Sequence, residues 1–351
     1  MRRVSGVFDV SYLEDMMVFR TWTHRIGIIG LVVFFLILPL FCSQFWLVFV
    51  STTAITAIAL LGLNLLSGYC GQISIGHTAF MAVGAYVSAI LAQRFGVPFW
   101  ICLPCAGLAA GLVGILFGLP SLRIKGYYLA LTTIAAQFII IYMIKTPFPN
   151  ITGGAIALHV PEVRLAGFLF ETEIHYYYLI IGLTLGMTFL VKSIMRSHFG
   201  RAFIAIRDND IAAEAMGISL YKHKLLAFFI GCFYAGVAGS AWGAYTRVIS
   251  PDDFTLMNSI WQMGMLIVGG LGSTLGPFFG VLFIKLLNEL CVVTGPWIVS
   301  IIPQIGAQIS AALVEMTFGI TIVLFLVFEP RGLAYRWEIL KESYRLWPFS
   351  Y

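Results

Sequence analysis

Uncharged stretches of about twenty residues or more alternate with short charged segments along this chain, a pattern typical of membrane-spanning helices. No Asp, Glu, Lys or Arg occurs in residues 26–93. One helix needs about 20 mostly apolar residues to cross a bilayer, so this run has room for three helices. We expect breaks between them near residues 42–44 and at residues 67–71.

The rest of the chain predicts further helices of the same kind. Uncharged stretches occupy residues 95–122, 126–144, 174–191, 225–246 and 254–284. The last of these continues as a mostly apolar stretch to about residue 295, and a further mostly apolar stretch runs from about 305 to 328. The Gly-rich segment 269–277 divides the longest of them into two helices. The pattern therefore predicts an all-α integral membrane protein with about ten transmembrane helices.

The composition excludes several other classes of protein. Of the 351 residues, 60% are hydrophobic and 11% are charged, and the mean hydropathy is +0.94. Soluble domains carry about 25% charged residues, so this chain has too few charges to cover a water-facing surface. A soluble enzyme and a disordered protein are thereby excluded. The net charge of +5 forms no basic stripe, and we expect a lipid bilayer but no nucleic acid as a partner.

The basic residues predict the orientation in the membrane. With ten helices and a cytoplasmic N-terminus, the cytoplasmic segments contain 16 Lys and Arg residues and the outer segments contain 4. Cytoplasmic loops are enriched in Lys and Arg, so both termini are expected in the cytoplasm. The predicted parts are a cytoplasmic segment at 1–25, a transmembrane domain at 26–328 with a cytoplasmic loop at 196–222, and a cytoplasmic tail at 329–351.

The first Gly-rich break allows two interpretations. Non-helical backbone at membrane depth is tolerated only where it meets protein or a water-filled cavity, so the break could line the path of a polar solute. It could equally be a short cytoplasmic turn before a helix whose small residues pack closely. The candidates for lining a path are Asn64, Gln72, Ser74 and His77. No second His or Cys lies at ligand spacing from His77, so no metal site is expected.

A second Gly-rich segment resembles the first. Gly68-x-x-Gly71 with Gly76 is similar in spacing to Gly269-x-x-Gly272 with Gly276. Transporters often contain internal repeats with Gly-interrupted helices near the substrate path. Because glycine is common in membrane helices, a chance match is the alternative.

The cytoplasmic loop at 196–222 contains a predicted short helix. Asp210 is the expected N-cap, the Ala-rich residues 212–216 are strong helix formers, and Gly217 is the expected stop. A helix with small residues on one side suits docking into a groove of another protein. The alternative is an ordinary connecting helix on the membrane surface.

Three ionisable residues are predicted at membrane depth: Lys285, Glu289 and Glu315. Such groups are functional candidates by default. Lys285 and Glu289 are four positions apart, however, and we favour a neutral pair on one helix face. Cys102 and Cys105 have the spacing of a redox pair, but buried thiols are inert.

Common enzyme motifs do not occur. We find no GxxxxGK[ST] phosphate loop, GxSxG elbow or HExxH metal motif in the sequence. We therefore expect no cofactor, and a transport subunit rather than an enzyme.

Nine short motifs, spread over residues 45–333, together resemble the LivM-type permease subunits of bacterial ATP-binding-cassette importers for branched-chain amino acids. They are Gly68-Tyr69-x-Gly71-Gln72-Ile73-Ser74-x-Gly76-His77, Ile124-Lys125-Gly126-Tyr127-Tyr128-Leu129-Ala130, Thr152-Gly153-Gly154, Gly200-Arg201-Ala202 with Arg207-Asp208, Ala212-Ala213-Glu214-Ala215-x-Gly217, Ser250-Pro251-Asp252-x-Phe254, Gly269-Gly270-Leu271-Gly272-Ser273, Gly276-Pro277 and Pro330-Arg331-Gly332-Leu333.

The resemblance implies a type II importer fold in a bacterial cytoplasmic membrane. It implies three kinds of partner: two cytoplasmic ATPase subunits, a second LivH-like permease subunit or a copy of this chain, and an extracytoplasmic substrate-binding protein. The loop at 196–222 would couple the permease to an ATPase through Arg207, Asp208, Glu214, Ala215 and Gly217. The binding protein would dock at Thr152, Gly153 and Gly154. The substrates would be branched-chain or other hydrophobic amino acids.

Three rival functions stay open. The related urea and amide permeases share much of this motif pattern. An ion-coupled secondary transporter would need ionisable groups at its substrate site, for which Lys285, Glu289 and Glu315 are the candidates. A membrane enzyme acting on lipid would need a clustered nucleophile, acid–base pair or metal set, and the sequence indicates none.

Overall fold

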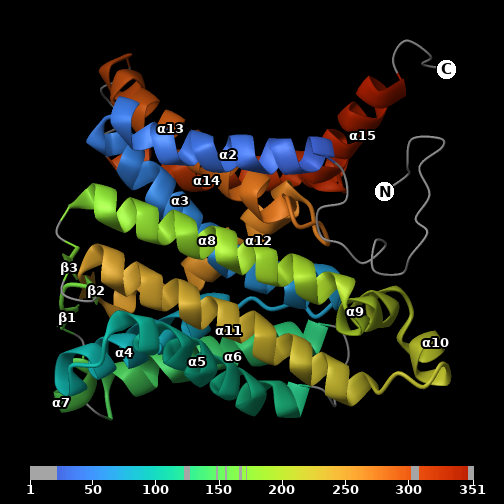
Figure 1. Ribbon diagram of the computed structural model, residues 1–351, viewed down its shortest axis with the longest axis horizontal. Coiled ribbons are helices and arrows are strands. Elements are labelled where there is room, and N and C mark those ends of the chain that lie inside the picture. Colours follow the sequence, from blue (N-terminus) through green and yellow to red (C-terminus); the bar gives the residue numbers. More distant parts are fainter. Residues whose placement is uncertain are drawn as a thin grey trace.

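The computed structural model describes residues 22–121, 127–147, 149–154, 156–165, 168–170, 172–301 and 308–346. Most of these residues form long helices that run roughly along one axis (Figure 1). The helices are α2 (Trp22–Phe41), α3 (Gln44–Leu63), the π-helix η1 (Asn64–Tyr69), α4 (His77–Phe95), α5 (Phe99–Ser121), α6 (Tyr127–Lys145), α7 (Pro149–Thr152), α8 (Glu173–Arg196), α9 (His198–Asp208), α10 (Asp210–Ala215), α11 (Leu220–Thr246), the 3₁₀ helix η2 (Pro251–Phe254), α12 (Leu256–Gly269), α13 (Gly276–Ile301), α14 (Gln308–Phe328) and α15 (Gly332–Leu346).

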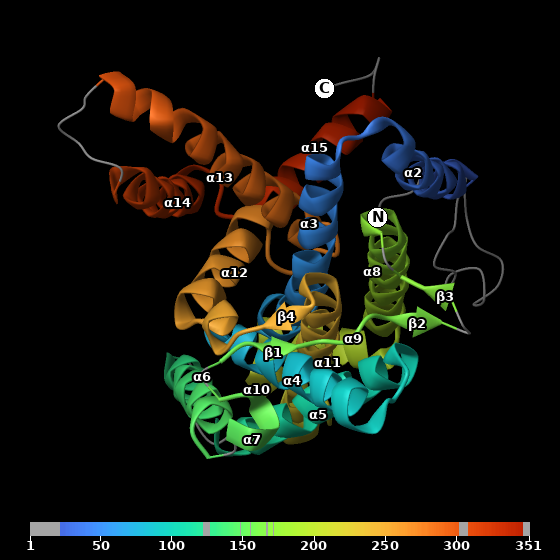
Figure 2. The same cartoon turned by 90° about the vertical axis from the view of Figure 1, so that its left-hand side faces the viewer.

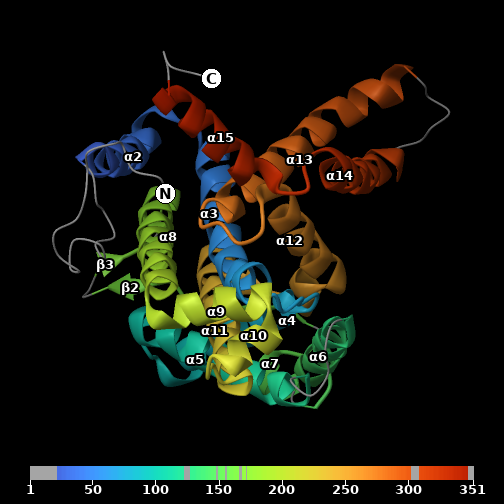
Figure 3. The same cartoon turned by 90° about the vertical axis from the view of Figure 1, so that its right-hand side faces the viewer.

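Short strands close one end of the bundle. In the described residues, β1 (Leu158–His159) pairs antiparallel with β4 (Val248–Ile249), and β2 (Arg164–Leu165) pairs antiparallel with β3 (Phe168–Leu169). Figure 1 shows β1, β2, β3 and α7 at one end and α9, α10 and α15 at the other. Figure 2 is viewed from the first end and Figure 3 from the second. The end with α9 and α10 is the one that the distribution of basic residues predicts to face the cytoplasm.

The all-α membrane class is confirmed. Among the described residues, seven helices are long and apolar enough to cross a bilayer, or eight if the bent pair of α14 and α15 is one span. Residues 29–41 of α2 and the whole of α12 are apolar but shorter. The helices are interrupted near the expected breaks at residues 42–44 and 269–277. The break expected at 67–71 lies at 70–76 instead, because residues 67–69 belong to η1, while the count of ten spans stays a prediction.

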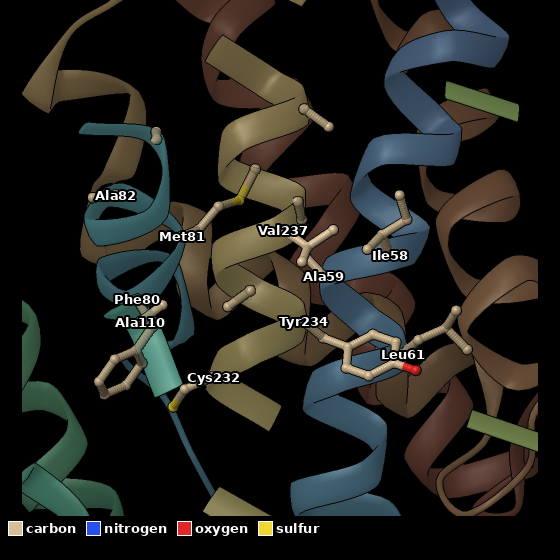
Figure 4. Packing of buried hydrophobic residues seen from close by; sticks show 14 of the residues in the cluster. Ile58, Ala59, Leu61, Phe80, Met81, Ala82, Ala110, Cys232, Tyr234 and Val237 are labelled. Atoms are coloured by element: carbon tan, nitrogen blue, oxygen red, sulfur yellow. The ribbon is translucent and has the colours of Figure 1, made fainter. Parts of the chain in front are cut away.

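Helix α11 lies at the centre of the bundle. It packs against α3, α4 and α5, and Figure 4 shows its residues Cys232, Tyr234 and Val237 among those of the neighbouring helices. Tyr234 is directed toward α3 and its hydroxyl donates to the carbonyl of Met187 in α8 at 3.0 Å. Cys232 lies against α5 at Gly114. All six cysteines, including Cys102 and Cys105, are free thiols.

Small residues bring α11 and α4 into backbone contact. A Cβ at Gly84 of α4 would collide with the backbone of Gly236 in α11, and a Cβ at Gly239 would collide with the carbonyl of Met81. Lipid chains are as apolar as the side chains, so close packing of small residues drives helix association in a bilayer.

Helices α13 and α14 project away from this centre (Figure 2). They expose large apolar side chains, among them Leu286, Leu290, Val293, Val323 and Val327. A soluble protein rarely exposes such a surface. It fits a chain whose solvent on that side is lipid.

We predict that a side chain at Gly84 destabilises the protein. Gly84→Leu inserts atoms where the backbones of α4 and α11 touch, and overpacking costs about 1–3 kcal/mol. The midpoint of thermal unfolding in detergent should fall. Gly182→Leu is the matched control, because nothing lies within 4 Å of a Cβ at Gly182 in α8. Equal midpoints for the two variants would contradict the role of this contact.

Candidate translocation path and coupling loop

The first Gly-rich break is a non-helical segment inside the bundle. After η1, the chain turns at Gly71 and runs without helical structure to His77. His77 Nε2 lies 3.0 Å from the carbonyl oxygen of Ala59, and Ala59 precedes the end of η1 by about ten residues, or roughly 15 Å of helix rise. The segment therefore runs back beside η1 to the last quarter of α3, which favours the path-lining interpretation over a short turn at the membrane surface.

A buried polar network holds the start of α4 at this depth. Thr78 Oγ1 lies 2.6 Å from Ser259 Oγ and 3.2 Å from Gln137 Oε1. The amide of Thr78 donates to Ser259 Oγ at 3.1 Å, and the amide of Ala79 donates to Gln137 Oε1 at 2.9 Å. The first amides of a helix have no intrahelical partner. Side chains of α6 and α12 supply partners for two of them.

The four predicted path residues are buried, and they divide into two kinds. Both polar atoms of the Asn64 carboxamide have partners: its Nδ2 donates to Ser273 O at 2.7 Å and its Oδ1 accepts from the amide of Gly272 at 2.9 Å. The side chains of Gln72, Ser74 and His77 each keep a buried polar atom without a partner in the described residues; these atoms are Gln72 Oε1, Ser74 Oγ and His77 Nδ1.

A cavity of about 310 Å³ lies beside the network and contains none of the four. Of the residues in the network, Thr78 lines this cavity. The other lining residues come from α3, α4, α11, η2, α12 and α13, and sequence reasoning missed most of them. Lys285 is the exception, because the sequence marked it as an intramembrane charge. No ion pair within 4.0 Å joins Lys285 to Glu289 among the described residues, although the two charges interact electrostatically.

The two Gly-rich segments meet near the end of the bundle that is predicted to face the cytoplasm. A Cβ at Gly68 would collide with the amide of Gly272, and Asn64 bridges the two segments. Arg207 in α9 binds the same place, donating from Nη1 to the carbonyl of Gly68 at 3.1 Å. Its Nη2 lies 2.9 Å from Asp208 Oδ1. The spacing that resembled a repeat thus belongs to two turns in contact, and the segment around Gly332 packs on the second.

The predicted docking helix exists as α10, with one correction. Its N-cap is Asn209, whose Oδ1 accepts from the amide of Ala212 at 3.0 Å, and Asp210 is the first helical residue. Gly217 ends the helix with φ +84°; its amide and that of Ile218 bond back to the carbonyls of Glu214 and Ala213, which is a Schellman motif.

The outer face of α10 is open. Glu214, Ala215 and Gly217 are exposed. Two large apolar side chains of this segment are also exposed: Ile211 by 73% and Met216 by 86%. Figure 3 shows α9 and α10 together at the cytoplasmic end. An exposed apolar pair beside a carboxylate is suited to contact with another protein.

Thr152, Gly153 and Gly154 lie at the opposite end, where Thr152 ends α7 and the two glycines follow it. Thr152 is buried and its Oγ1 donates to the carbonyl of Ile144 at 2.7 Å. Gly153 and Gly154 both have positive φ, so these residues shape a tight turn. Ion pairs flank that end, between Lys145 and Asp252 at 2.8 Å and between Arg247 and Glu162 at 3.0 Å.

Some sequence predictions fall outside the described residues. They are most of the cytoplasmic segment at 1–25, the first three residues of the motif at 124–130, and the end of the tail beyond 346.

Comparison with known proteins finds one family and several relatives. The family model described as branched-chain amino acid transport system / permease component matches residues 43–326. The chain is 30% identical over 295 residues to the high-affinity branched-chain amino acid transport system permease protein LivM of Escherichia coli, covering 77% of this chain and 69% of that protein.

Two further relatives carry the same type of name. The LivM protein of Salmonella typhimurium is 29% identical over 295 residues, covering 77% of this chain and 69% of its own. The probable branched-chain amino acid transport permease protein LivM of Methanocaldococcus jannaschii is 26% identical over 234 residues, covering 65% of this chain and 66% of its own. No solved structure matches.

We predict that Asn64 holds the second Gly-rich segment in place. Asn64→Leu keeps the side-chain volume but removes the acceptor of the Gly272 amide, so that amide should exchange its hydrogen faster. Hydrogen exchange read by mass spectrometry on peptides covering 270–276 measures this. Peptides from the centre of α11 are the internal control and should be unchanged. Unaltered exchange at 270–276 would show that the segment keeps its position without Asn64.

Proposed function

This chain belongs to the family of branched-chain amino acid transport permease components, and on that premise we propose that it is the membrane-spanning permease subunit of an ATP-binding-cassette importer. It moves branched-chain or other hydrophobic amino acids that an extracytoplasmic binding protein delivers. The observation that carries the proposal is the family match over residues 43–326, which includes the non-helical segment at 70–76. Its place is the cytoplasmic membrane of a bacterium, with both termini in the cytoplasm.

The translocation path passes the break before α4. Buried polar atoms are normally paired, yet Gln72, Ser74 and His77 each leave one without a partner in the residues described. Water or a polar solute completes these hydrogen bonds when the path opens. Asn64 has a different role, because both polar atoms of its side chain already have hydrogen-bond partners. These bonds connect the helix before the path segment to the second Gly-rich segment.

The loop at 196–222 couples the permease to a partner ATPase, which hydrolyses the ATP. Glu214 and Ala215 present the exposed side of α10, and Gly217 fixes where the helix ends. Arg207, held by Asp208, connects this loop to Gly68 beside the path segment. A displacement of α10 and the adjoining α9 is therefore transmitted toward the break through the hydrogen bond from Arg207 to Gly68. Nucleotide shifts the permease between outward- and inward-facing states through its different affinity for the two.

The remaining partners follow from the same assembly. A second permease subunit, LivH-like or a copy of this chain, completes the path, and two ATPase subunits bind from the cytoplasm. The binding protein docks at the outer end, where the turn at Thr152, Gly153 and Gly154 sets the shape of the surface. The ion pairs there, such as Lys145 with Asp252, give that surface its charges.

Two other functions have an observation in their favour. A urea or amide permease fits the neutral polar atoms of the break. An ion-coupled carrier fits Lys285 and Glu289, which line one cavity of about 210 Å³. The three relatives are named as branched-chain amino acid permeases, which favours amino-acid import over these two functions.

We predict that Glu214→Arg abolishes most of the ATP hydrolysis that substrate stimulates. The change reverses the charge on the exposed side of α10 and should leave assembly intact, because the Glu214 side chain is exposed rather than buried in the core. The measurement is ATPase activity of the reconstituted importer with its binding protein and leucine, valine, phenylalanine or urea. Glu338→Arg, an exposed charge reversal on α15 at the same end, is the matched control and should keep the activity.

Each outcome of that assay has a separate meaning. Stimulation by leucine or valine that only Glu214→Arg loses supports the importer and the coupling helix. Stimulation by urea alone would support the importer but show that its substrate is urea rather than an amino acid. Uptake by this chain without an ATPase, driven by an ion gradient, would refute the importer and support the secondary carrier.

A further inference from the structure

The cavity beside the polar network lies where helices from both halves of the chain meet. Its volume is about 310 Å³, at the lower end of the range for small-molecule sites. It is lined by Thr56 of α3, Thr78 and Met81 of α4, Trp242 of α11, Asp253 and Phe254 of η2, Asn258, Trp261, Gln262 and Met265 of α12, and Ile284, Lys285 and Asn288 of α13.

Several polar atoms of this lining lack partners. Gln262 is 7% exposed, and its Oε1 has no hydrogen-bond partner in the described part of the chain. The same holds for the indole Nε1–H of Trp242. Buried polar groups in native proteins are nearly always paired. A buried acceptor and a buried donor that line one cavity therefore point to a ligand or to water with both functions.

The cavity also contains one residue of each charge. Lys285 comes from α13, and its Nζ forms no ion pair within 4.0 Å among the described residues. Asp253 comes from η2, where its Oδ2 accepts from the amide of Ser250 at 2.9 Å and its Oδ1 accepts no hydrogen bond from the residues described. A charge at membrane depth is costly and marks a functional site by default.

Apolar side chains form the rest of the wall. Met81, Phe254, Trp261, Met265 and Ile284 line the same space. Trp261 is fixed by stacking on Phe318 of α14 with ring centroids 3.8 Å apart. An aromatic and methionine wall accepts apolar groups of varied shape. The cavity thus combines a cation, an anion, neutral hydrogen-bonding groups and an apolar surface.

We propose that this cavity binds a free amino acid as a zwitterion with an apolar side chain. Lys285 and the Trp242 N–H receive the carboxylate, Asp253 and Gln262 Oε1 receive the ammonium group, and the apolar wall receives the side chain. The assignment rests on the proposed function and deepens it, because it places the substrate within this subunit. A site built for charged groups strongly rejects analogues that lack them, so it excludes urea.

A neighbouring cavity supplies an approach to Lys285. It measures about 210 Å³, and it is lined by Phe45, Val48, Phe49 and Thr52 from the beginning of α3 and by Lys285, Asn288 and Glu289 of α13. The beginning of α3 lies on the extracytoplasmic side in the predicted orientation. Lys285 and Asn288 belong to both cavities. An amino acid that arrives from outside therefore meets Lys285 before it reaches Gln262.

The test measures ligand binding to the complete importer in nanodiscs, without its binding protein. Each measurement is made twice, once without nucleotide and once with a non-hydrolysable ATP analogue. The probes are radiolabelled leucine, leucinamide, which lacks the carboxylate, 4-methylpentanoate, which lacks the amine, and urea. Lys285→Gln should raise the Kd for leucine by about tenfold or more, as expected for a lost hydrogen bond to a charged group, and should change the Kd for leucinamide much less. Asp253→Asn should raise the Kd for leucine in the same way, and should change the Kd for 4-methylpentanoate, which lacks the amine, much less.

Controls separate binding from folding. Lys285→Arg keeps the charge and should retain leucine binding, and the exposed Lys222→Gln should bind like wild type. A diazirine analogue of leucine should label peptides of α12 in wild type, and leucine but not urea should compete with it.

The outcomes also distinguish this inference from the proposed function. Equal weakening of all ligands by both charge variants would give Lys285 and Asp253 a structural role and overturn the site. Absence of labelling in α12, with leucine-stimulated ATPase activity intact, would overturn the site and leave the importer. Wild-type binding of urea in place of leucine would overturn the site together with its substrate class. Leucine binding with the predicted selectivity, but without any ATPase stimulation, would support the site and refute the importer.

Discussion

Within a bilayer, each backbone amide and carbonyl needs a partner from the protein or from trapped water, and the rest of this structure depends on how that requirement is met between α3 and α4. The chain leaves helical geometry at Gly71 and resumes it at His77. The amide of Ile75 donates to Thr133 Oγ1 at 3.0 Å, and the first amides of α4 donate to the side chains of Gln137 and Ser259. The break is possible because α6 and α12 bring their polar side chains to it, so the positions of three helices are set by one segment.

The residues on either side of this segment make two different sets of contacts. Gly68, before it, touches Gly272 and accepts a hydrogen bond from Arg207, and Thr78, after it, borders the cavity. The dense packing of α11 on α3, α4 and α5 provides a rigid support against which these contacts can shift. Exposed apolar helices surround this support, whereas the polar groups concentrate in the few places where chain segments from distant parts of the sequence meet.

The sequence predicted the helices well because charge gaps and Gly-rich breaks are local signals. It also located α10 and its stop at Gly217, since capping depends on residues a few positions apart, although the cap is Asn209 and not Asp210. The cavity was not predictable in this way. Gln262, Trp242 and Asp253 come from three elements, and only their meeting in space shows which atoms lack partners. The same limit affected Asn64, whose carboxamide looked available until Gly272 and Ser273 were seen beside it.

The π-helical turn η1 affects where the chain length can change. A π-helix bonds each amide to the fifth preceding carbonyl, as the amide of Cys70 does with Leu65 O at 3.2 Å. The wider turn is the place where the helix holds one residue more than an α-helix would, so removing one residue there would restore α-helical bonding with little rotation between the two flanking segments. In the α-helical part of α3, by contrast, each deleted residue would rotate everything beyond it by about 100°. A one-residue deletion is therefore easier to accommodate at residues 64–69 than earlier in α3.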